Sequence, residues 1–174
     1  MVNVTLEQEA LVERAKRITN MLTDCDGVLT DGGVYYGQGG EMMLRFHRRD
    51  GMGVARLRGA GVVTSIVTQE RSPIVQHRAT KLGVRLFEGI KDKLQLLPLL
   101  LAELDVSLNE LSFIGDDVND LPLLLAVRET GLTAAPADAE ASVREVVHFV
   151  SAAAGGQGAF REFSEWLLKL RGSE

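Results

Sequence analysis

The stretch Met21-Leu-Thr-Asp-Cys-Asp-Gly-Val-Leu-Thr-Asp31 decides the fold. It ends an apolar segment, Ile18–Thr23, with the polar pair Asp24 and Asp26 and then Gly27, as a buried strand followed by a turn would. Because helical patterns separate this segment from further apolar ones, we expect a mostly parallel sheet with helices on both faces. The sequence predicts one doubly wound α/β domain over residues 1–174. The further strands are predicted at Val62–Val67, Val84–Phe87, Leu111–Ile114, Leu132–Ala135 and Val147–Val150.

Capping residues mark the helices between these strands. Thr5 and Gln8 form a capping-box pattern that opens a helix to about Ile18. Asp50 is expected to cap a second helix that runs to about Arg58. The other helices are predicted at Ser72–Leu82, Asp92–Leu104 with a bend or break at Pro98, after Asn119, within Ala139–Glu145 and at Ala159–Leu170.

One insert interrupts the alternation after the first strand. Glycines cluster at Gly37–Gly40, between the apolar segments Val34-Tyr-Tyr36 and Met42-Met-Leu-Arg-Phe46. Apolar segments on both sides of a glycine turn are typical of a β-hairpin. The sequence therefore predicts a small hairpin at about residues 32–47.

Composition excludes several classes of protein. The 174 residues are 45% apolar and 25% charged, close to the average for globular domains. The longest apolar stretch, Leu94–Leu104, contains polar residues and Pro98, so we expect no membrane span. A net charge of −5 with 5% aromatic residues argues against nucleic-acid binding. One cysteine and an N-terminus without signal-peptide features predict a cytoplasmic protein.

Polar side chains that carry chemistry follow several of the predicted strands. Asp24 and Asp26 follow the first strand, Thr68 follows the strand at 62–67, and Asp116 follows the strand at 111–114. Lys93 stands after the short strand at 84–87. Ligands of doubly wound sheets bind beyond the carboxyl ends of the strands. We therefore expect these side chains to share one site.

The residue types in this set suit phosphoryl transfer. Neighbouring carboxylates repel each other, and Mg²⁺ with oxygen ligands relieves that repulsion. Asp116 and Asp120 are candidates to complete its coordination shell. Thr68 can donate a hydrogen bond to a phosphoryl oxygen, and Lys93 can place a positive charge on it. One aspartate of the Asp-x-Asp pair can act as nucleophile while the other serves as general acid and base.

Each of these motifs has an ordinary structural explanation when taken alone. Asp-x-Asp-Gly sequences are common in turns, Thr68 can cap a strand end, and Lys93 can be a surface lysine. Their combination in this order, each near a predicted strand end, favours a phosphoryl-transfer site.

The four motifs resemble those of the haloacid dehalogenase (HAD) phosphatases. They are Asp24-Cys-Asp-Gly-Val-Leu-Thr-Asp31, Thr68, Lys93 and Gly115-Asp-Asp-Val-Asn-Asp120. Further segments resemble the small capless branch that contains 3-deoxy-D-manno-octulosonate 8-phosphate phosphatases and the 9-phosphate phosphatases of nonulosonic (sialic-type) acids. These segments are Phe46–Gly53, Glu88–Lys93, Ala134–Ala139 and Gly155–Glu162, and the resemblance spans Met21–Leu170. It implies a HAD-like phosphatase that hydrolyses the phosphate monoester of a 2-keto-3-deoxy sugar acid through an aspartyl-phosphate intermediate.

The resemblance also implies roles for individual residues. The nucleophile would be Asp24 and the general acid/base Asp26. The implied Mg²⁺ ligands are Asp24, the backbone carbonyl of Asp26, and Asp116. Asp117 and Asp120 would support the metal from nearby. Thr68 and Lys93 would bind the phosphate.

The family further implies a homotetramer. A chain of 174 residues has no room for the cap domain that closes other HAD active sites. In the resembled branch, hairpins of four subunits pack together and neighbouring subunits complete each site. Val34, Tyr35, Met42 and Met43 fit this arrangement, because a lone hairpin is marginally stable in water. The alternative is that these side chains fold back on their own core.

The carboxylate of a sugar acid needs cations besides Lys93. Arg78 and Lys81 lie three residues apart on one predicted helix and face the same way. Arg49 follows the hairpin, and Glu70 can accept hydrogen bonds from sugar hydroxyls. The same charged residues would also suit a plain solvated helix face. Glu70, Arg78, Lys81 and Asn119 favour a nine-carbon substrate, whereas Gln69 departs from the glycine common to both groups, so the substrate stays open between the two.

Two other functions fit part of the pattern. A signalling receiver domain also surrounds a phosphorylated aspartate with acidic, hydroxyl and lysine side chains, but it carries its acceptor aspartate later in the chain. A phosphatase-like oligomerisation or binding module with little turnover would not need all four motifs to be complete.

A glycine-rich stretch remains outside these assignments. Gly155, Gly156 and Gly158 permit a tight turn before the last helix. They either approach the substrate or a neighbouring chain, or form a plain loop.

Overall fold

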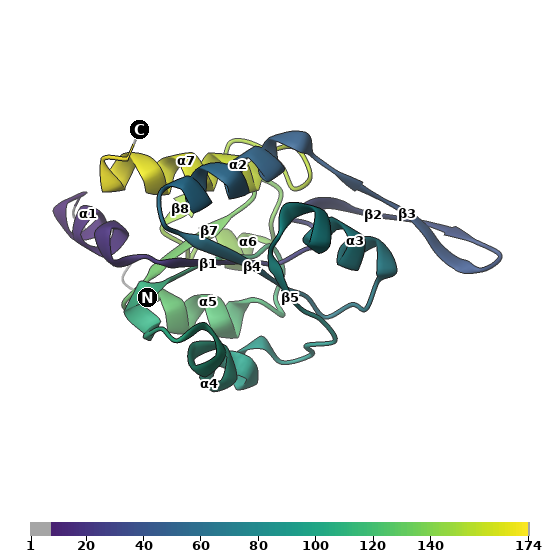
Figure 1. Ribbon diagram of the computed structural model, residues 1–174, viewed down its shortest axis with the longest axis horizontal. Helices are drawn as coiled ribbons and strands as arrows, with labels where there is room; N and C mark the ends of the chain where they lie inside the picture. Colours follow the sequence, from purple (N-terminus) through teal and green to yellow (C-terminus); the bar gives the residue numbers. More distant parts are fainter. Residues whose placement is uncertain (1–7, 174) are drawn as a thin grey trace.

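A parallel sheet of six strands forms the centre of the molecule, in the order β5-β4-β1-β6-β7-β8 (Figure 1). The computed structural model describes residues 8–173. All neighbouring strands of this sheet are parallel, as predicted. The strands are β1 (Asn20–Thr23), β4 (Val63–Val67), β5 (Arg85–Phe87), β6 (Leu111–Ile114), β7 (Leu132–Ala135) and β8 (Phe149–Val150).

Helices cover both faces of the sheet (Figure 1). One face carries α1 (Gln8–Arg17), α2 (Arg48–Gly59), α3 (Pro73–Leu82) and α7 (Ala159–Arg171). The other carries α4 (Lys93–Leu104), α5 (Leu121–Arg128) and the short α6 (Ala141–Arg144). A single 3₁₀ turn, Leu108–Glu110, precedes β6. No helix within residues 8–173 is long and apolar enough to cross a membrane.

Alternating side chains of the central strands fill two separate hydrophobic cores. In β1, Met21 packs under α2 and α7, whereas Leu22 packs with α4 and α5. In β6, Ile114 joins the first core and Phe113 the second. Burial of each such side chain stabilises the fold by about 1.5–3 kcal/mol. Helices cover both faces of the central strands, and the polar side chains within these strands, such as Asn20, Thr64 and Ser112, are themselves buried.

The strand order reverses between β1 and β6. The chain leaves β1 towards the face covered by α2, and it leaves β6 towards the face covered by α5. Thr23 pairs with Ile114 in this register, so Asp24 and Gly115 leave the sheet side by side. Such a reversal leaves a crevice beyond the strand ends, where doubly wound folds bind their ligands.

The predicted hairpin is present as an antiparallel pair, β2 (Thr30–Gly37) and β3 (Gly40–Phe46), outside the main sheet. It extends away from the body of the molecule (Figure 1). Val34, Tyr35, Met42 and Met43 do not fold back on the core, so that alternative is wrong, whereas Leu44 and Phe46 of β3 do pack against the first core. The exposed ones are Val34, Tyr35, Tyr36, Met42 and Met43, with Tyr36 74% exposed.

The prediction that Asp50 caps α2 is wrong. His47 is the N-cap residue, and its Nδ1 accepts a hydrogen bond from the Arg49 N–H at 3.3 Å. Asp50 lies buried in the first turn and accepts a hydrogen bond from the Arg161 N–H at the start of α7, at 3.0 Å. Aspartate suits both a cap and a first helical turn, so its position in the sequence does not distinguish them.

Other boundaries differ less. Helix α4 continues through Pro98, which is exposed and has no N–H to donate to the carbonyl of Leu94. The last strand is shorter than predicted, with only Phe149 and Val150 in β8. The capping box expected at Thr5 lies outside the described residues.

Candidate active site

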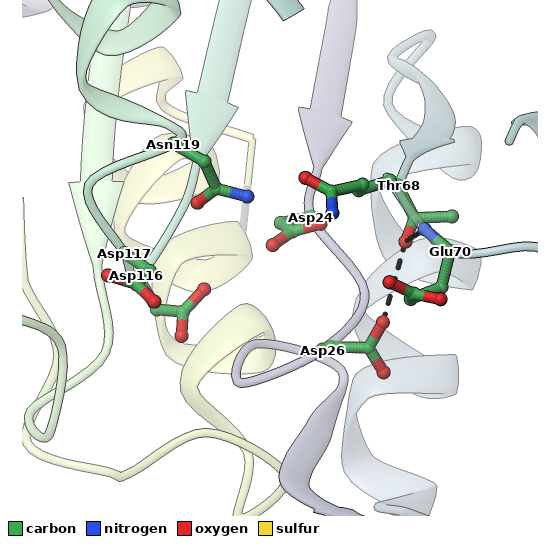
Figure 2. Close-up of a pocket in the computed structure, with 8 residues that line it drawn as sticks. Asp24, Asp26, Thr68, Glu70, Asp116, Asp117 and Asn119 are labelled. Carbon is green, nitrogen blue, oxygen red and sulfur yellow. Dashed lines mark hydrogen bonds between the residues drawn. The ribbon is translucent and has the colours of Figure 1, made fainter. Parts of the chain in front are cut away.

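A pocket of about 160 Å³ opens at the carboxyl ends of β1, β4 and β6 (Figure 2). Asp24 directly follows β1, and Asp26 stands in the turn that comes after it. Thr68 follows β4, and Asp116 comes from the loop after β6. The structure thus brings the predicted strand ends together. The pocket is lined by Asp24, Asp26, Thr68, Gln69, Glu70, Asp116, Asp117 and Asn119.

A buried ion-pair network holds Asp24 at the floor of the site. Lys93, the first residue of α4, is 2% exposed and places its Nζ 2.8 Å from Oδ1 of Asp24 and 2.5 Å from Oδ1 of Asp120. Burial raises the pKa of Asp24, and the nearby Lys93 opposes that shift. Burial alone would lower the pKa of Lys93, but Asp24 and Asp120 outweigh it, so the pKa rises and the ammonium stays charged. Removal of either partner would leave a buried charge without compensation.

Asp26 faces Thr68 across the pocket. The Thr68 hydroxyl donates to Oδ2 of Asp26 at 3.4 Å (Figure 2), and the Thr30 hydroxyl lies 3.5 Å from Oδ1. Burial, followed by the charges of Glu41 and Glu70, raises the pKa of Asp26. A carboxyl with a raised pKa holds its proton more readily, as a general acid requires.

Asp116 stands opposite, in contact with the backbone of Gly27. A Cβ built on Gly27 would lie 2.0 Å from Oδ2 of Asp116, and Gly27 has a φ of +80°. Only glycine satisfies both conditions. Burial, then the charges of Asp24 and Asp120, raises the pKa of Asp116 to about 8. Oδ2 of Asp120 accepts a hydrogen bond from the Asp116 N–H at 3.0 Å, which ties the two residues together.

Three of these carboxylates form a group suited to a cation. One oxygen from each of Asp24, Asp116 and Asp120 lies within 4.8 Å of the others. With all three carboxylates ionised, the single ammonium of Lys93 would leave two negative charges without a counterpart. A divalent cation would balance that excess, and oxygen ligands are those that Mg²⁺ prefers.

The remaining predicted residues are divided between the pocket and the surface. Glu70 and Asp117 line the pocket, whereas Arg49, Arg78 and Lys81 do not. Arg78 instead donates from Nη2 to the His47 carbonyl at 3.2 Å and lies over the Phe46 ring, 5.3 Å from its centroid. Arg49 and Lys81 are exposed, on α2 and α3. Within one chain, no lysine or arginine lines the described pocket.

No pattern in the sequence predicts the contacts that Glu41 and Thr30 make near Asp26. Glu41 belongs to β3, and the Ser72 hydroxyl at the start of α3 donates to its carboxylate. Thr30 lies four residues after Asp26 and also accepts the N–H of Gly27 at 3.3 Å. Both contacts depend on how the hairpin leaves the sheet, which no local pattern encodes.

Comparison with known proteins identifies the family. No protein-family model matches the chain. The 3-deoxy-D-manno-octulosonate 8-phosphate phosphatase KdsC of Haemophilus influenzae is 37% identical over 161 residues, which cover 92% of this chain and 88% of that protein. The chain belongs to the KdsC-type phosphatase family of the HAD superfamily. This confirms the resemblance carried by the four motifs.

Solved structures of KdsC-type and other HAD proteins share the fold. The 3-deoxy-D-manno-octulosonate 8-phosphate phosphatase from Moraxella catarrhalis, in complex with magnesium, phosphate and KDO, superposes with a TM-score of 0.87 at 32% identity, over 95% of this chain and 94% of that one. A Legionella pneumophila hydrolase of HAD subfamily III A superposes with a TM-score of 0.88 at 34% identity, over 94% and 89%. The capless HAD-like fold is therefore confirmed.

The residues of this KdsC-type phosphatase fit Mg²⁺. Oδ1 of Asp116 is buried and has no hydrogen-bond partner among the described residues. A buried carboxylate oxygen without a partner is costly, and a metal ion would satisfy it. Together with the two negative charges that the ionised cluster would leave unbalanced, this supports magnesium as the cofactor.

Proposed function

We propose that the chain hydrolyses the phosphate monoester of a 2-keto-3-deoxy sugar acid, with 3-deoxy-D-manno-octulosonate 8-phosphate as its substrate. The observation that carries the proposal is the meeting of Asp24, Asp26, Thr68 and Asp116 in one pocket. The relatives named as phosphatases of this substrate match more than nine-tenths of the chain at 32–37% identity. Asp24 is the nucleophile and Asp26 the general acid and base in this proposal.

The first half of the reaction transfers the phosphoryl group to the protein. A carboxylate oxygen of Asp24 attacks phosphorus, the bond from phosphorus to the sugar oxygen breaks, and the leaving oxygen takes the proton of Asp26. Lys93 favours the ionised form of the buried Asp24 and holds the carboxylate in place. Thr68 donates its hydroxyl hydrogen to a phosphoryl oxygen.

The second half releases phosphate. Asp26, now a carboxylate, takes a proton from water, and the water oxygen attacks phosphorus. The bond to Asp24 breaks, which yields inorganic phosphate and restores both aspartates.

The residues that would hold Mg²⁺ are Asp24, Asp116 and the backbone carbonyl of Asp26, with Asp117 and Asp120 in support. When bound, the ion supplies positive charge that reduces the repulsion between the phosphate and the attacking carboxylate. The chain itself contributes the close approach of these groups, which Gly27 permits beside Asp116. Asp120 contributes by fixing both Lys93 and the backbone of Asp116.

We further propose that four copies assemble through their hairpins. Tyr35 and Met43 face each other across the hairpin, and both are more than half exposed. An apolar surface of this kind on a projecting hairpin marks an interaction site. A neighbouring subunit would also bring Arg49, Arg78 or Lys81 towards a pocket that lacks basic side chains of its own.

A nine-carbon nonulosonate 9-phosphate is the second candidate substrate. Glu70 and Asn119 both line the pocket (Figure 2), and the resemblance of the sequence motifs associates these residues with the nine-carbon group. Gln69, which also lines the pocket, is common to neither group.

Hydrolysis of the two substrate types by the purified protein tests the proposal. We expect Mg²⁺-dependent phosphate release, with kcat/KM at least tenfold higher for the eight-carbon substrate, a ratio within the range that pocket contacts supply, about 10–200-fold. Asp24→Asn should abolish turnover, whereas the matched change Asp105→Asn, at an exposed site away from the pocket, should not. A preference for the nine-carbon ester would select the second candidate. Equal, feeble activity on all esters would support the binding-module alternative instead.

A further inference from the structure

The glycine segment before α7, residues 154–158, packs directly against the turn that carries Asp26. A Cβ built on Gly155 would lie 1.9 Å from the carbonyl oxygen of Gly27, so a larger residue cannot fit unless that turn moves. The Gly156 N–H donates to the Val28 carbonyl at 2.9 Å. Gly155 and Gly156 are both buried. The glycine segment therefore supports the turn by backbone contacts alone.

Two carboxylates accept hydrogen bonds from backbone N–H groups within the glycine segment and just before it. Oδ1 of Asp138, in the loop after β7, accepts a hydrogen bond from the Gly155 N–H at 2.9 Å. Oε2 of Glu162, in the first turn of α7, accepts from the N–H groups of Ala152 at 2.7 Å and Ala153 at 3.2 Å. Asp138 is itself exposed. Its bond to Gly155 thus reaches the buried segment from the surface without contributing to either hydrophobic core.

Gly27 lies between the glycine segment and Asp116, on the side of the site where the metal would bind. One side of its Cα meets the carboxylate of Asp116, and its carbonyl meets Gly155. Asp116, Gly27 and Gly155 are therefore stacked without free space between them. A shift of Gly155 must move Gly27, and with it the neighbouring peptide and side chain of Asp26.

We propose that Asp138 and Gly155 are positioning residues for the phosphatase reaction. Asp138 fixes Gly155, and Gly155 fixes the Gly27 peptide and so the side chain and carbonyl of Asp26. The inference rests on the role of Asp26 under the proposed function. Displacement of a reacting group by about 1 Å lowers a rate by about 100-fold. Asp24 and Lys93, which belong to the separate ion-pair network, would stay in place.

Three variants test the proposal, Gly155→Ala, Asp138→Ala and Asp138→Asn. Gly59→Ala is the matched control, because an added Cβ there meets no atom within 4 Å. The measurements are kcat and KM on p-nitrophenyl phosphate, Mg²⁺ affinity by calorimetry, thermal unfolding, and hydrogen exchange of the turn. The turn amides to follow are those of Val28, Leu29 and Thr30, which donate to the Cys25 carbonyl.

The expected pattern separates positioning from general stability. Gly155→Ala should lower kcat by about 100-fold with KM changed less than about threefold, weaken Mg²⁺ binding and speed exchange of the turn amides. Asp138→Ala should lower kcat by about tenfold with unchanged thermal unfolding, since a smaller shift costs less. Asp138→Asn should restore kcat to within about twofold of the wild type, because an amide oxygen also accepts the Gly155 N–H.

Other outcomes would overturn the proposal. The proposal fails if Gly155→Ala has the kcat, the Mg²⁺ affinity and the hydrogen exchange of the wild type. The turn that carries Asp26 would then not depend on its contact with Gly155. Equal loss in Asp138→Ala and Asp138→Asn would show that the hydrogen bond is not the cause. If Gly155→Ala does not fold, the two Asp138 variants decide. If the wild type hydrolyses no phosphate ester, the proposed function fails, whereas Mg²⁺ affinity and hydrogen exchange still test the support of the turn.

Discussion

Without Mg²⁺, the folded protein should lose stability as the pH rises from about 6 to about 8. Burial and neighbouring carboxylates raise the pKa of Asp116 from 3.8 to about 8 and that of Asp120 to about 6. The folded state therefore keeps protons that the unfolded chain has already released. Because the folded state binds more protons, the free energy of unfolding falls with rising pH. The stabilisation is fully present below about pH 4 and is lost as the pH approaches the folded pKa of Asp116.

The size of this loss follows from the two pKa values of Asp116. One extra proton held by the folded state gives a slope of about 1.4 kcal/mol per pH unit. For a folded pKa of about 8, the loss between pH 6 and pH 8 integrates to about 2 kcal/mol. Asp120 adds only a few tenths of a kcal/mol there, because it titrates near pH 6. In a chain of this length, about 2 kcal/mol lowers Tm by about 4–8 °C.

Thermal unfolding with EDTA or with Mg²⁺, at several pH values, measures the effect. Mg²⁺ keeps the carboxylates ionised, so the pH slope should vanish and stability should rise by about 2.7 kcal/mol at 100 times the Kd. Asp116→Asn should remove most of the slope in EDTA and most of the gain from Mg²⁺. Asp105→Asn, an exposed control, should retain both. The reasoning would be refuted if the stability of the wild type in EDTA stayed constant or rose with increasing pH. It would also be refuted if Asp116→Asn kept the wild-type dependence of stability on pH.

Three further predictions concern Lys93, the hairpin and α1. Lys93→Met should destroy turnover and, in EDTA, destabilise the fold by about 3–5 kcal/mol in urea unfolding, because it leaves buried carboxylates unpaired; the exposed Lys91→Met should do neither. If four copies assemble through their hairpins as proposed, Met43→Lys should give smaller species in light scattering, whereas Leu99→Lys, at a similarly exposed apolar site on α4, should not. Arg14 donates to the carbonyls of Arg128, Glu129 and Gly131 at 2.6–3.0 Å. Arg14→Ala should therefore lower the free energy of unfolding, measured in urea, by about 1.5–3 kcal/mol. A decrease below about 0.5 kcal/mol would contradict this.

The sheet and the strand ends could be predicted because they depend on short-range patterns. Met21 and Leu22 point to opposite cores, so the strand had to be apolar on both faces, and that run is visible in the sequence. The first charged residue after the strand, Asp24, then marks its carboxyl end. Parallel strands end at one edge, so Asp116 had to lie near Asp24 once both strands were assigned.

Pairings between distant segments could not be predicted. The carboxylate of Asp50 bonds to the backbone of Arg161, 111 positions away, where the sequence suggested a local helix cap. Lys93 was predicted as a phosphate-binding cation, and its pairing with Asp120 appears only when α4 and α5 are packed. Helical spacing placed Arg78 and Lys81 on one face, but it gave no information about Phe46, on which Arg78 lies.

The charge of the pocket connects the chemistry of the site to assembly. Five carboxylates line it, and the nearby Lys93 is already paired with two carboxylates. A sugar acid phosphate carries negative charge at both ends, and one divalent cation at the Asp24 end cannot also balance the distant carboxylate. Under the proposed function and assembly, basic side chains of a neighbouring subunit, held by the hairpin, balance this second charge. A dissociated Met43→Lys variant should therefore have a raised KM for the sugar acid phosphate and an unchanged KM for p-nitrophenyl phosphate, which lacks the carboxylate. Equal effects on both substrates would mean that assembly stabilises the catalytic residues and does not supply the cation.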